Sequence, residues 1–229
     1  MKGRFQPGSF LRTKTSVTAR LIIQRSGVSF SKILVVGCGS GMEAAVLAQE
    51  FQAEVVGIDL DSSIFDPAAG QAVDLRIGDA TRLDFNDDQF DLVYSFHVLE
   101  HIPLFREALS EMARVLRPEG VLFVGVPNRA RWIGYLGSEH VNWRKKVEWN
   151  WEDWKSRMQG KFKNEFGAHA GYLSQELKAE LKKIFEQPEE ITLDYYLERY
   201  RKYSPLIHLL DWSGLSTFLF PAIFFMARK

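Results

Sequence analysis

Residues 33–41 read Ile-Leu-Val-Val-Gly-Cys-Gly-Ser-Gly, and Asp59 follows the last of these glycines by eighteen positions. The four apolar residues predict a buried strand, and the glycines let the backbone turn sharply and approach a ligand where a Cβ would clash. The helix expected next can hold a negative group at its N-terminal amides. Asp59 ends a second apolar stretch, where its carboxylate can accept hydrogen bonds from a ribose diol. The stretch therefore predicts a nucleoside-binding crevice.

The glycine pattern alone fits two classes of nucleoside cofactor. Residues 39–44 read Gly-Ser-Gly-Met-Glu-Ala and fit the G-x-G-x-x-G/A pattern of dinucleotide enzymes. Residues 37–41 fit the G-x-G-x-G loop of S-adenosylmethionine (SAM) enzymes equally well. Gly37 directly follows the strand, and the dinucleotide pattern, which begins at Gly39, does not use it. The position of Gly37 therefore favours SAM. An NAD(P)-dependent oxidoreductase remains the alternative enzyme.

Strand and helix patterns alternate along the chain, which predicts an α/β fold with a doubly wound, mainly parallel sheet of the Rossmann-like type. We expect helices at 41–51 and 103–116, and another that has Ser174 as its N-cap and an apolar face of Leu177, Leu181, Ile184 and Phe185. Seven strands are expected, at 33–37, 54–59, 73–77, 90–96, 120–126, 191–197 and 218–227.

Four blocks in this order resemble the class I SAM-dependent methyltransferases, and in particular the small-molecule enzymes related to ubiquinone-biosynthesis O-methyltransferases. The blocks are residues 33–41 with Asp59, Gly-Asp-Ala at 78–80, residues 90–101, and residues 114–128. The resemblance covers roughly residues 20–127. It implies SAM as cofactor, an antiparallel final strand, and methyl transfer to the oxygen, nitrogen or carbon of a small molecule.

The resemblance also implies which residues hold the cofactor. Asp59 would bind the ribose, and Asp79 with Ala80 would contact the adenine, although an aspartate beside a glycine is also common in turns. Leu60 would pack on the adenosine, and Phe96 and His97 would border the same crevice. The complete expected set is Gly37, Cys38, Gly39, Gly41, Asp59, Leu60, Asp79, Ala80, Phe96 and His97.

His101 is the candidate catalytic residue, because a neutral imidazole can take a proton from an acceptor hydroxyl near neutral pH. The alternative is that His101 caps or packs the following helix. His97 and His101 have the spacing of a metal pair, but Pro103 indicates a loop entering a helix rather than one helical face, so no metal is expected.

One position departs from the family pattern. The family usually carries an acidic residue where this chain has Val35, and that residue helps to hold the methionine amino group. Glu43, two residues past the glycine loop, is a candidate substitute. As an acid in the first turn of a helix, it is equally expected simply to favour the helix dipole.

Five of the six tryptophans lie between residues 132 and 154, interleaved with charged residues. They could form a packed subdomain, since aromatic side chains bury large areas. We favour an aromatic lid over residues 129–170, because tryptophans among charges rarely all lie inside. Such a lid suits a quinone-like, lipid or sugar acceptor. A SAM-binding or membrane-peripheral protein without turnover remains the non-enzyme alternative.

The composition limits the remaining choices. The 229 residues suit a single domain, 1–229, and a net charge of zero argues against a nucleic-acid binder. Cys38 is the only cysteine, which is consistent with a reducing, cytoplasmic setting. The apolar run 215–227 is short and contains Pro221, so membrane contact is expected to be peripheral at most.

The first 32 residues carry seven Lys or Arg and no acid. This pattern is typical of an organelle transit peptide or of an ordinary N-terminal helix. We favour the helix, because the first strand of the fold begins at Ile33.

Overall fold

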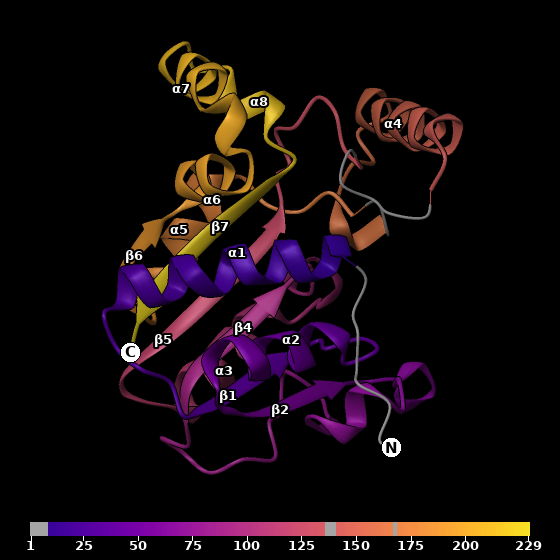
Figure 1. The fold of residues 1–229 in the computed structure, drawn as a ribbon. Helices are drawn as coiled ribbons and strands as arrows, with labels where there is room; N and C mark the ends of the chain where they lie inside the picture. Colours follow the sequence, from indigo (N-terminus) through magenta and orange to yellow (C-terminus); the bar gives the residue numbers. More distant parts are fainter. Residues whose placement is uncertain (1–8, 136–140, 167–168) are drawn as a thin grey trace.

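The computed structural model describes residues 9–135, 141–166 and 169–229. These residues form one seven-stranded sheet with the strand order β3-β2-β1-β4-β5-β7-β6 (Figure 1). Only β7 runs antiparallel to its neighbours, β5 and β6. The strands are β1 (Lys32–Val36), β2 (Glu54–Asp59), β3 (Asp74–Ile77), β4 (Phe90–Phe96), β5 (Leu116–Pro127), β6 (Glu186–Glu190) and β7 (Ala222–Arg228). The expected Rossmann-like, mainly parallel sheet is confirmed.

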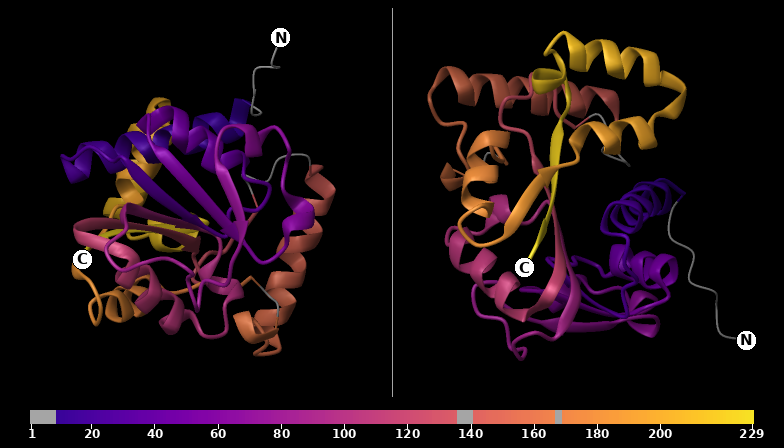
Figure 2. Two further views of the ribbon diagram at one scale, coloured as in Figure 1. Left: turned by 90° about the horizontal axis from the view of Figure 1, so that it is seen from below. Right: turned by 90° about the vertical axis from the view of Figure 1, so that its left-hand side faces the viewer.

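Helices cover both faces of the sheet (Figure 2). One face packs against α1 (Ser9–Ser26), α2 (Met42–Phe51) and α6 (Thr192–Arg199). The other face packs against α3 (Phe105–Val115) and α5 (Ser174–Leu181). Strand β1 shows why both faces must be covered, because Ile33 and Val35 enter the first core and Leu34 and Val36 enter the second. A central parallel strand is apolar on both sides for this reason.

The remaining elements lie mostly outside these two layers. At the carboxyl ends of the parallel strands stand α4 (Trp143–Met158), α7 (Ser204–Trp212) and α8 (Ser216–Leu219), at the top of Figure 1. Within the described ranges, no helix is both long and apolar enough to cross a membrane. Five short 3-10 helices complete the described part of the chain: η1 (Ser62–Ile64), η2 (Ala69–Gln71), η3 (Leu99–His101), η4 (Asn164–Phe166) and η5 (Arg201–Tyr203).

The expected strand at 191–197 is wrong, since Thr192–Arg199 is helix α6. The alternation of apolar and polar residues there suggested a strand, but Thr192, Tyr195 and Tyr196 are buried together at helical spacing. The Thr192 hydroxyl also accepts a hydrogen bond from the Phe224 amide at 3.0 Å, which fixes the start of α6 against β7.

The sixth strand is instead β6, whose sequence Glu-Gln-Pro-Glu-Glu is polar and contains Pro188. It lies at the edge of the sheet, beyond β7. A proline is tolerated in an edge strand because its missing amide is not needed by a further neighbour. The last strand begins at Ala222 rather than at 218, because residues 216–219 turn once as α8.

The predicted N-cap role of Ser174 is also wrong. The helix begins at Ser174 itself, and the Ser174 hydroxyl hydrogen-bonds the Glu190 carboxylate on β6 instead of an amide of its own first turn. The apolar face is largely as expected, with Leu177, Leu181 and Phe185 buried and Ile184 packed at its margin.

Gly171 joins the segment after α4 to the end of β5. Its φ is +75°, and a Cβ built on it would lie 1.9 Å from the carbonyl oxygen of Pro127. The Tyr172 amide donates to that same carbonyl at 3.0 Å, and Asn164 Oδ1 accepts from the Gly171 amide at 2.8 Å. Only glycine combines this backbone conformation with so close an approach.

We therefore expect Gly171→Ala to destabilise the fold strongly, with Gly160→Ala as the matched control. Gly160 has a φ of +68°, and nothing lies within 4 Å of its Cβ position. Both variants carry the left-handed strain of roughly 1–2 kcal/mol, and Gly171→Ala adds roughly 1–3 kcal/mol from overlap. Denaturant unfolding measures both, and equal losses would contradict the assigned contact.

Candidate functional site

The glycine loop lies between β1 and α2 and leaves no room for side chains on its inner side. A Cβ on Gly37 would lie 2.3 Å from Val98 Cγ2, and one on Gly41 would lie 2.7 Å from Leu75. At Gly39, by contrast, a Cβ would meet nothing within 4 Å. The loop is therefore packed against the protein at both ends and open to a ligand in its middle.

Asp59 stands at the end of β2 and holds this loop in place. Its Oδ2 accepts a hydrogen bond from the Gly39 amide at 2.8 Å, and its Oδ1 accepts from the Asp61 amide at 3.3 Å. Each carboxylate oxygen has a second acceptor site. The group can therefore support the loop and still accept hydrogen bonds from the two hydroxyls of a ribose.

Asp79 lies at the end of the neighbouring strand, because the Gly78 amide donates to the Asp59 carbonyl at 3.0 Å. Asp79 Oδ1 accepts hydrogen bonds from the Thr81 amide and hydroxyl, both at 2.8 Å. These bonds lower the pKa of Asp79. The carboxylate thus forms the turn expected beside a glycine and remains charged and exposed at the same edge as Asp59.

Two apolar side chains are exposed between these carboxylates. Leu60, which directly follows β2, is 73% exposed, and Ile77, the last residue of β3, is 68% exposed. Ala80 is half-buried beside them. An apolar platform next to carboxylates suits a planar base. Sequence analysis had singled out Leu60 and Ala80 and missed Ile77, which looked like an ordinary strand residue.

Within the glycine loop, Cys38 can offer a ligand only its backbone. Its side chain is buried against Gly57, and burial raises the pKa of its thiol to about 12. A thiol in this state is neither a nucleophile nor a metal ligand at neutral pH.

Glu43 does more than favour a helix dipole. It accepts a hydrogen bond from the Tyr94 hydroxyl at 2.7 Å and one from the Thr15 hydroxyl at 3.2 Å, and Lys14 Nζ lies 3.2 Å from its Oε1. Tyr94 pairs with Val35 in the sheet. Glu43 therefore brings a carboxylate close to the position that lacks the family acid, and it ties α1 to the sheet there.

A cavity of about 760 Å³ opens beyond the glycine loop, next to Phe96 and His97 at the end of β4. Strands β1 and β4 are paired up to Val36 and Ser95, so the loop and the cavity start from neighbouring strand ends. Nine of the twenty lining residues are Phe, Tyr or Trp: Phe96, Tyr135, Trp149, Tyr195, Tyr196, Tyr200, Tyr203, Phe220 and Phe224. Cavities of this size and character commonly bind small molecules.

Sequence analysis did not identify the tyrosines of this cavity. Tyr196, Tyr200, Tyr203 and Ile207 recur at intervals of three or four residues, which is the spacing of one helical face. That signal was available, but residues 191–197, which include Tyr196, had been predicted as a strand. Lys14, which sits 3.9 Å above the Phe96 ring, was also missed, since nothing local marks it.

Three histidines gather around one buried carboxylate at the cavity edge. The Glu100 side chain is 1% exposed, and its Oε2 has no hydrogen-bond partner among the described residues. Its Oε1 lies 3.3 Å from His97 Nδ1 and 3.9 Å from His101 Nε2. His97 adopts a φ of +57°, a conformation uncommon outside glycine and often found at functional sites.

The third of these histidines is His169, which lies far along the chain from the other two. Its ring lies 4.6 Å from the ring of His101, and it lines the cavity together with His97. His101 itself is not among the lining residues. Burial and the nearby His101 lower the pKa of His169, which favours the neutral imidazole.

The aromatic segment is anchored through a buried ion pair. Arg131 Nη2 donates to Asp153 on α4 at 2.9 Å, and Tyr135 donates to the other oxygen of Asp153 at 3.0 Å. Arg157 donates to the carbonyls of Arg129 and Arg131. Only part of the expected lid, residues 129–135, 141–166 and 169–170, lies within the described residues.

No cluster of three or more His, Cys, Asp or Glu side chains suited to a metal occurs in the part of the chain that the structure describes.

A family model described as a methyltransferase domain matches residues 34–124. A "Probable S-adenosylmethionine-dependent methyltransferase" of Mycolicibacterium smegmatis is 36% identical over 99 residues, which are 42% of this chain and 38% of that protein. The ubiquinone biosynthesis O-methyltransferase of Pseudomonas aeruginosa is 31% identical over 130 residues, or 52% of this chain and 56% of that protein. The chain thus spans only about half, or less, of these relatives' length.

Among solved structures, phosphoethanolamine N-methyltransferase 2 of Haemonchus contortus in complex with S-adenosyl-L-methionine superposes with a TM-score of 0.58. It is 20% identical, and the match covers 93% of this chain and 52% of that one. At this identity the likeness shows the fold alone. Over residues 34–124, which are less than half of the chain, the sequence matches the methyltransferase-domain family and is similar to SAM-dependent methyltransferases.

Proposed function

We propose that the protein transfers a methyl group from SAM to a small, largely apolar acceptor held in the aromatic cavity. One observation carries the proposal: the glycine loop and the cavity begin at the paired ends of β1 and β4, so that a cofactor and an acceptor would meet at Phe96 and His97. When bound, SAM supplies a methyl group already activated by its sulfonium. The protein then needs mainly to align the partners and exclude water.

The residues of the crevice suit SAM. Gly37, Gly39 and Gly41 give a loop without side chains at the site of close approach. Asp59 would accept from the ribose hydroxyls, while Asp79 and Leu60 would hold the adenine. Val35 leaves the amino group without its usual acid. We propose that Glu43, which stands beside Tyr94, takes over this role.

The lining of the cavity supports an acceptor with rings or long apolar parts. Aromatic side chains stack on flat rings and pack on acyl or prenyl chains. Quinone-like and lipid acceptors therefore fit better than sugars, and this agrees with the ubiquinone-related relative. A cytoplasmic setting is part of the proposal and is supported by the single, reduced cysteine. Neither the oxidoreductase nor the protein without turnover gains support from the comparisons.

Where the acceptor must lose a proton, we propose that His169 and His101 act as a pair. His169 lines the cavity with a lowered pKa that favours the neutral imidazole, and the His101 ring lies 4.6 Å from it. His101, the candidate from the sequence, would then be a positioning residue that keeps the pKa of His169 low. Glu100 would hold His97 and His101 in place.

The function is tested by incubating the protein with methyl-labelled SAM and a cell extract, followed by separation into organic and aqueous phases. We expect label in the organic phase. Asp59→Ala should weaken binding of S-adenosylhomocysteine by about 2 kcal/mol or more, roughly thirtyfold, because the ribose acceptors are lost.

Asp61→Ala is the matched control for that variant, since Asp61 is an exposed carboxylate two residues away whose observed bond caps η1. Calorimetry measures both affinities. Parental affinity in Asp59→Ala would refute the ribose assignment, and absence of transferred label with intact cofactor binding would favour a protein without turnover.

The histidine pair is tested with His169→Gln and His101→Gln. Loss of a general base typically slows turnover about 10²–10⁴-fold, and we expect this for His169→Gln. Because a base works only when neutral, the parental rate should fall as the pH drops through the lowered pKa of His169. In His101→Gln the pKa of His169 should rise, because the neighbouring imidazole that lowers it is gone. The fall of the methyl-transfer rate at low pH should then occur at a higher pH than in the parent protein. If His101→Gln lost as much rate as His169→Gln and its pH profile did not move, His101 would be the base.

The lid over residues 129–170 is tested by hydrogen exchange. We expect the α4 amides to exchange faster than those of the sheet and to slow when cofactor and acceptor bind. Helix α3 serves as control, since it packs on the opposite core and lines no part of the cavity. Core-like protection of α4 without ligands would instead support a packed subdomain.

A further inference from the structure

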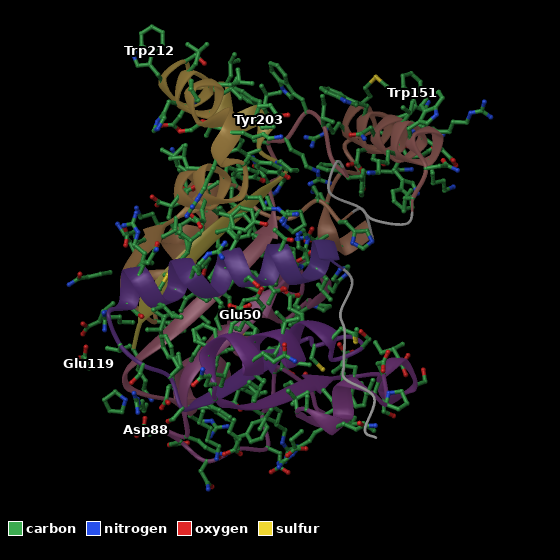
Figure 3. The ribbon with its side chains drawn as sticks, viewed as in Figure 1. Glu50, Asp88, Glu119, Trp151, Tyr203 and Trp212 are labelled. Atoms are coloured by element: carbon green, nitrogen blue, oxygen red, sulfur yellow. The ribbon has the colours of Figure 1, made fainter. Side chains whose placement is uncertain are left out.

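Helices α4 and α7 carry exposed apolar stripes at the same end of the molecule (Figure 3). On α4, Trp143, Val147 and Trp151 recur every four residues and are 70%, 59% and 62% exposed. On α7, Leu209 and Trp212 are 56% and 85% exposed. Figure 3 shows Trp151 and Trp212 both pointing away from the sheet. We call these two stripes the apical face.

Large apolar side chains in such a group are unusual on a soluble surface and mark an interaction site. Tryptophan is also the side chain enriched at the boundary between lipid and water, because its ring is apolar and its N–H is polar. The tryptophans of α4 stand on a helix that carries Lys, Arg and acidic residues between them, a pattern typical of helices that lie in a membrane surface.

The charge near the apical face indicates what kind of surface it meets. Residues 143–158 and 199–215 hold eight Lys or Arg and four Asp or Glu, whereas the whole chain has 29 of each. These two segments are therefore net positive, while the rest of the chain taken together is net negative; residues 1–32 are the other basic segment of the chain. One of the four acids, Asp153, is buried against Arg131. A positive, tryptophan-bearing face complements an anionic lipid surface.

The same helices line the cavity with their inner sides. Trp149 of α4 and Ile207 and Leu210 of α7 contribute to the lining, while their neighbours in sequence form the apical face. A bilayer against the apical face would thus lie next to two helices that form part of the cavity wall.

We propose that the apical face docks the protein on the surface of an anionic lipid bilayer. The docking proposal rests only on the exposed apolar stripes and on the net positive charge of residues 143–158 and 199–215. That an apolar acceptor enters the cavity from this bilayer is a second step, and it rests on the proposed function.

The test is sedimentation of the protein with vesicles of phosphatidylcholine, with or without phosphatidylglycerol. We expect binding to the anionic vesicles that weakens as salt is added. The double variant Trp151→Ser, Trp212→Ser should bind roughly tenfold or more weakly, because apolar area no longer enters the interface. Lys202→Gln should lose roughly fivefold, as expected for one basic residue at such a surface.

Leu209→Ser and Leu104→Ser form a matched pair, since the two leucines are 56% and 57% exposed and only Leu209 belongs to the apical face. Weaker vesicle binding in Leu209→Ser alone supports the proposal. Equal behaviour of the two variants, or no binding to anionic vesicles by the parent protein, overturns it. A dimer in sedimentation velocity that Trp151→Ser, Trp212→Ser dissociates, without vesicle binding, would assign the face to a second copy instead.

None of these readouts uses SAM or turnover. Vesicle binding without methyl transfer would support the docking proposal and contradict the proposed function. Methyl transfer without vesicle binding would support the proposed function and contradict the docking proposal.

Discussion

The hydrogen bond from the Gly39 amide to the Asp59 carboxylate is the interaction on which the cofactor crevice depends. It joins the loop after β1 to the end of β2, and the Gly78 amide extends the same edge to β3 by donating to the Asp59 carbonyl. The loop is packed against Val98 and Leu75 at its two outer glycines and is open at Gly39 between them. The crevice is therefore shaped before any ligand arrives, and its polar group is already oriented.

The cavity depends on a different part of the chain. Phe96 and His97 come from the end of β4, but most of the aromatic wall comes from residues 195–224 and from the segment around α4. These elements are tied down by contacts distant in sequence, such as Arg131 with Asp153 and Gly171 with Pro127. In the proposed function, one edge of the sheet thus combines a cofactor crevice formed by local sequence with an acceptor cavity formed by the later segments. Folds of this type vary their function in the same way.

The contrast explains what the sequence could and could not predict. The strands around residues 33–37, 54–59 and 90–96 and the residues of the glycine loop are marked by apolar runs and glycines, and those signals are local. Helix α6 was predicted as a strand because a short apolar pattern fits both periods. Strand β6 was missed because an edge strand containing Pro188 and three glutamates lacks any apolar signal. The gathering of His97, His101 and His169 around Glu100 required the fold, since His169 lies far along the chain.

The most direct test of the account is an amide NMR titration of the intact protein with S-adenosylhomocysteine. The account predicts that the largest shift changes occur at Gly37, Gly39, Gly41 and the residues following Asp59, where the open side of the loop meets the ligand. The amides of α3, on the opposite face, should move little. Changes confined to the aromatic cavity, or none at the loop, would contradict the assignment of the crevice as the cofactor site.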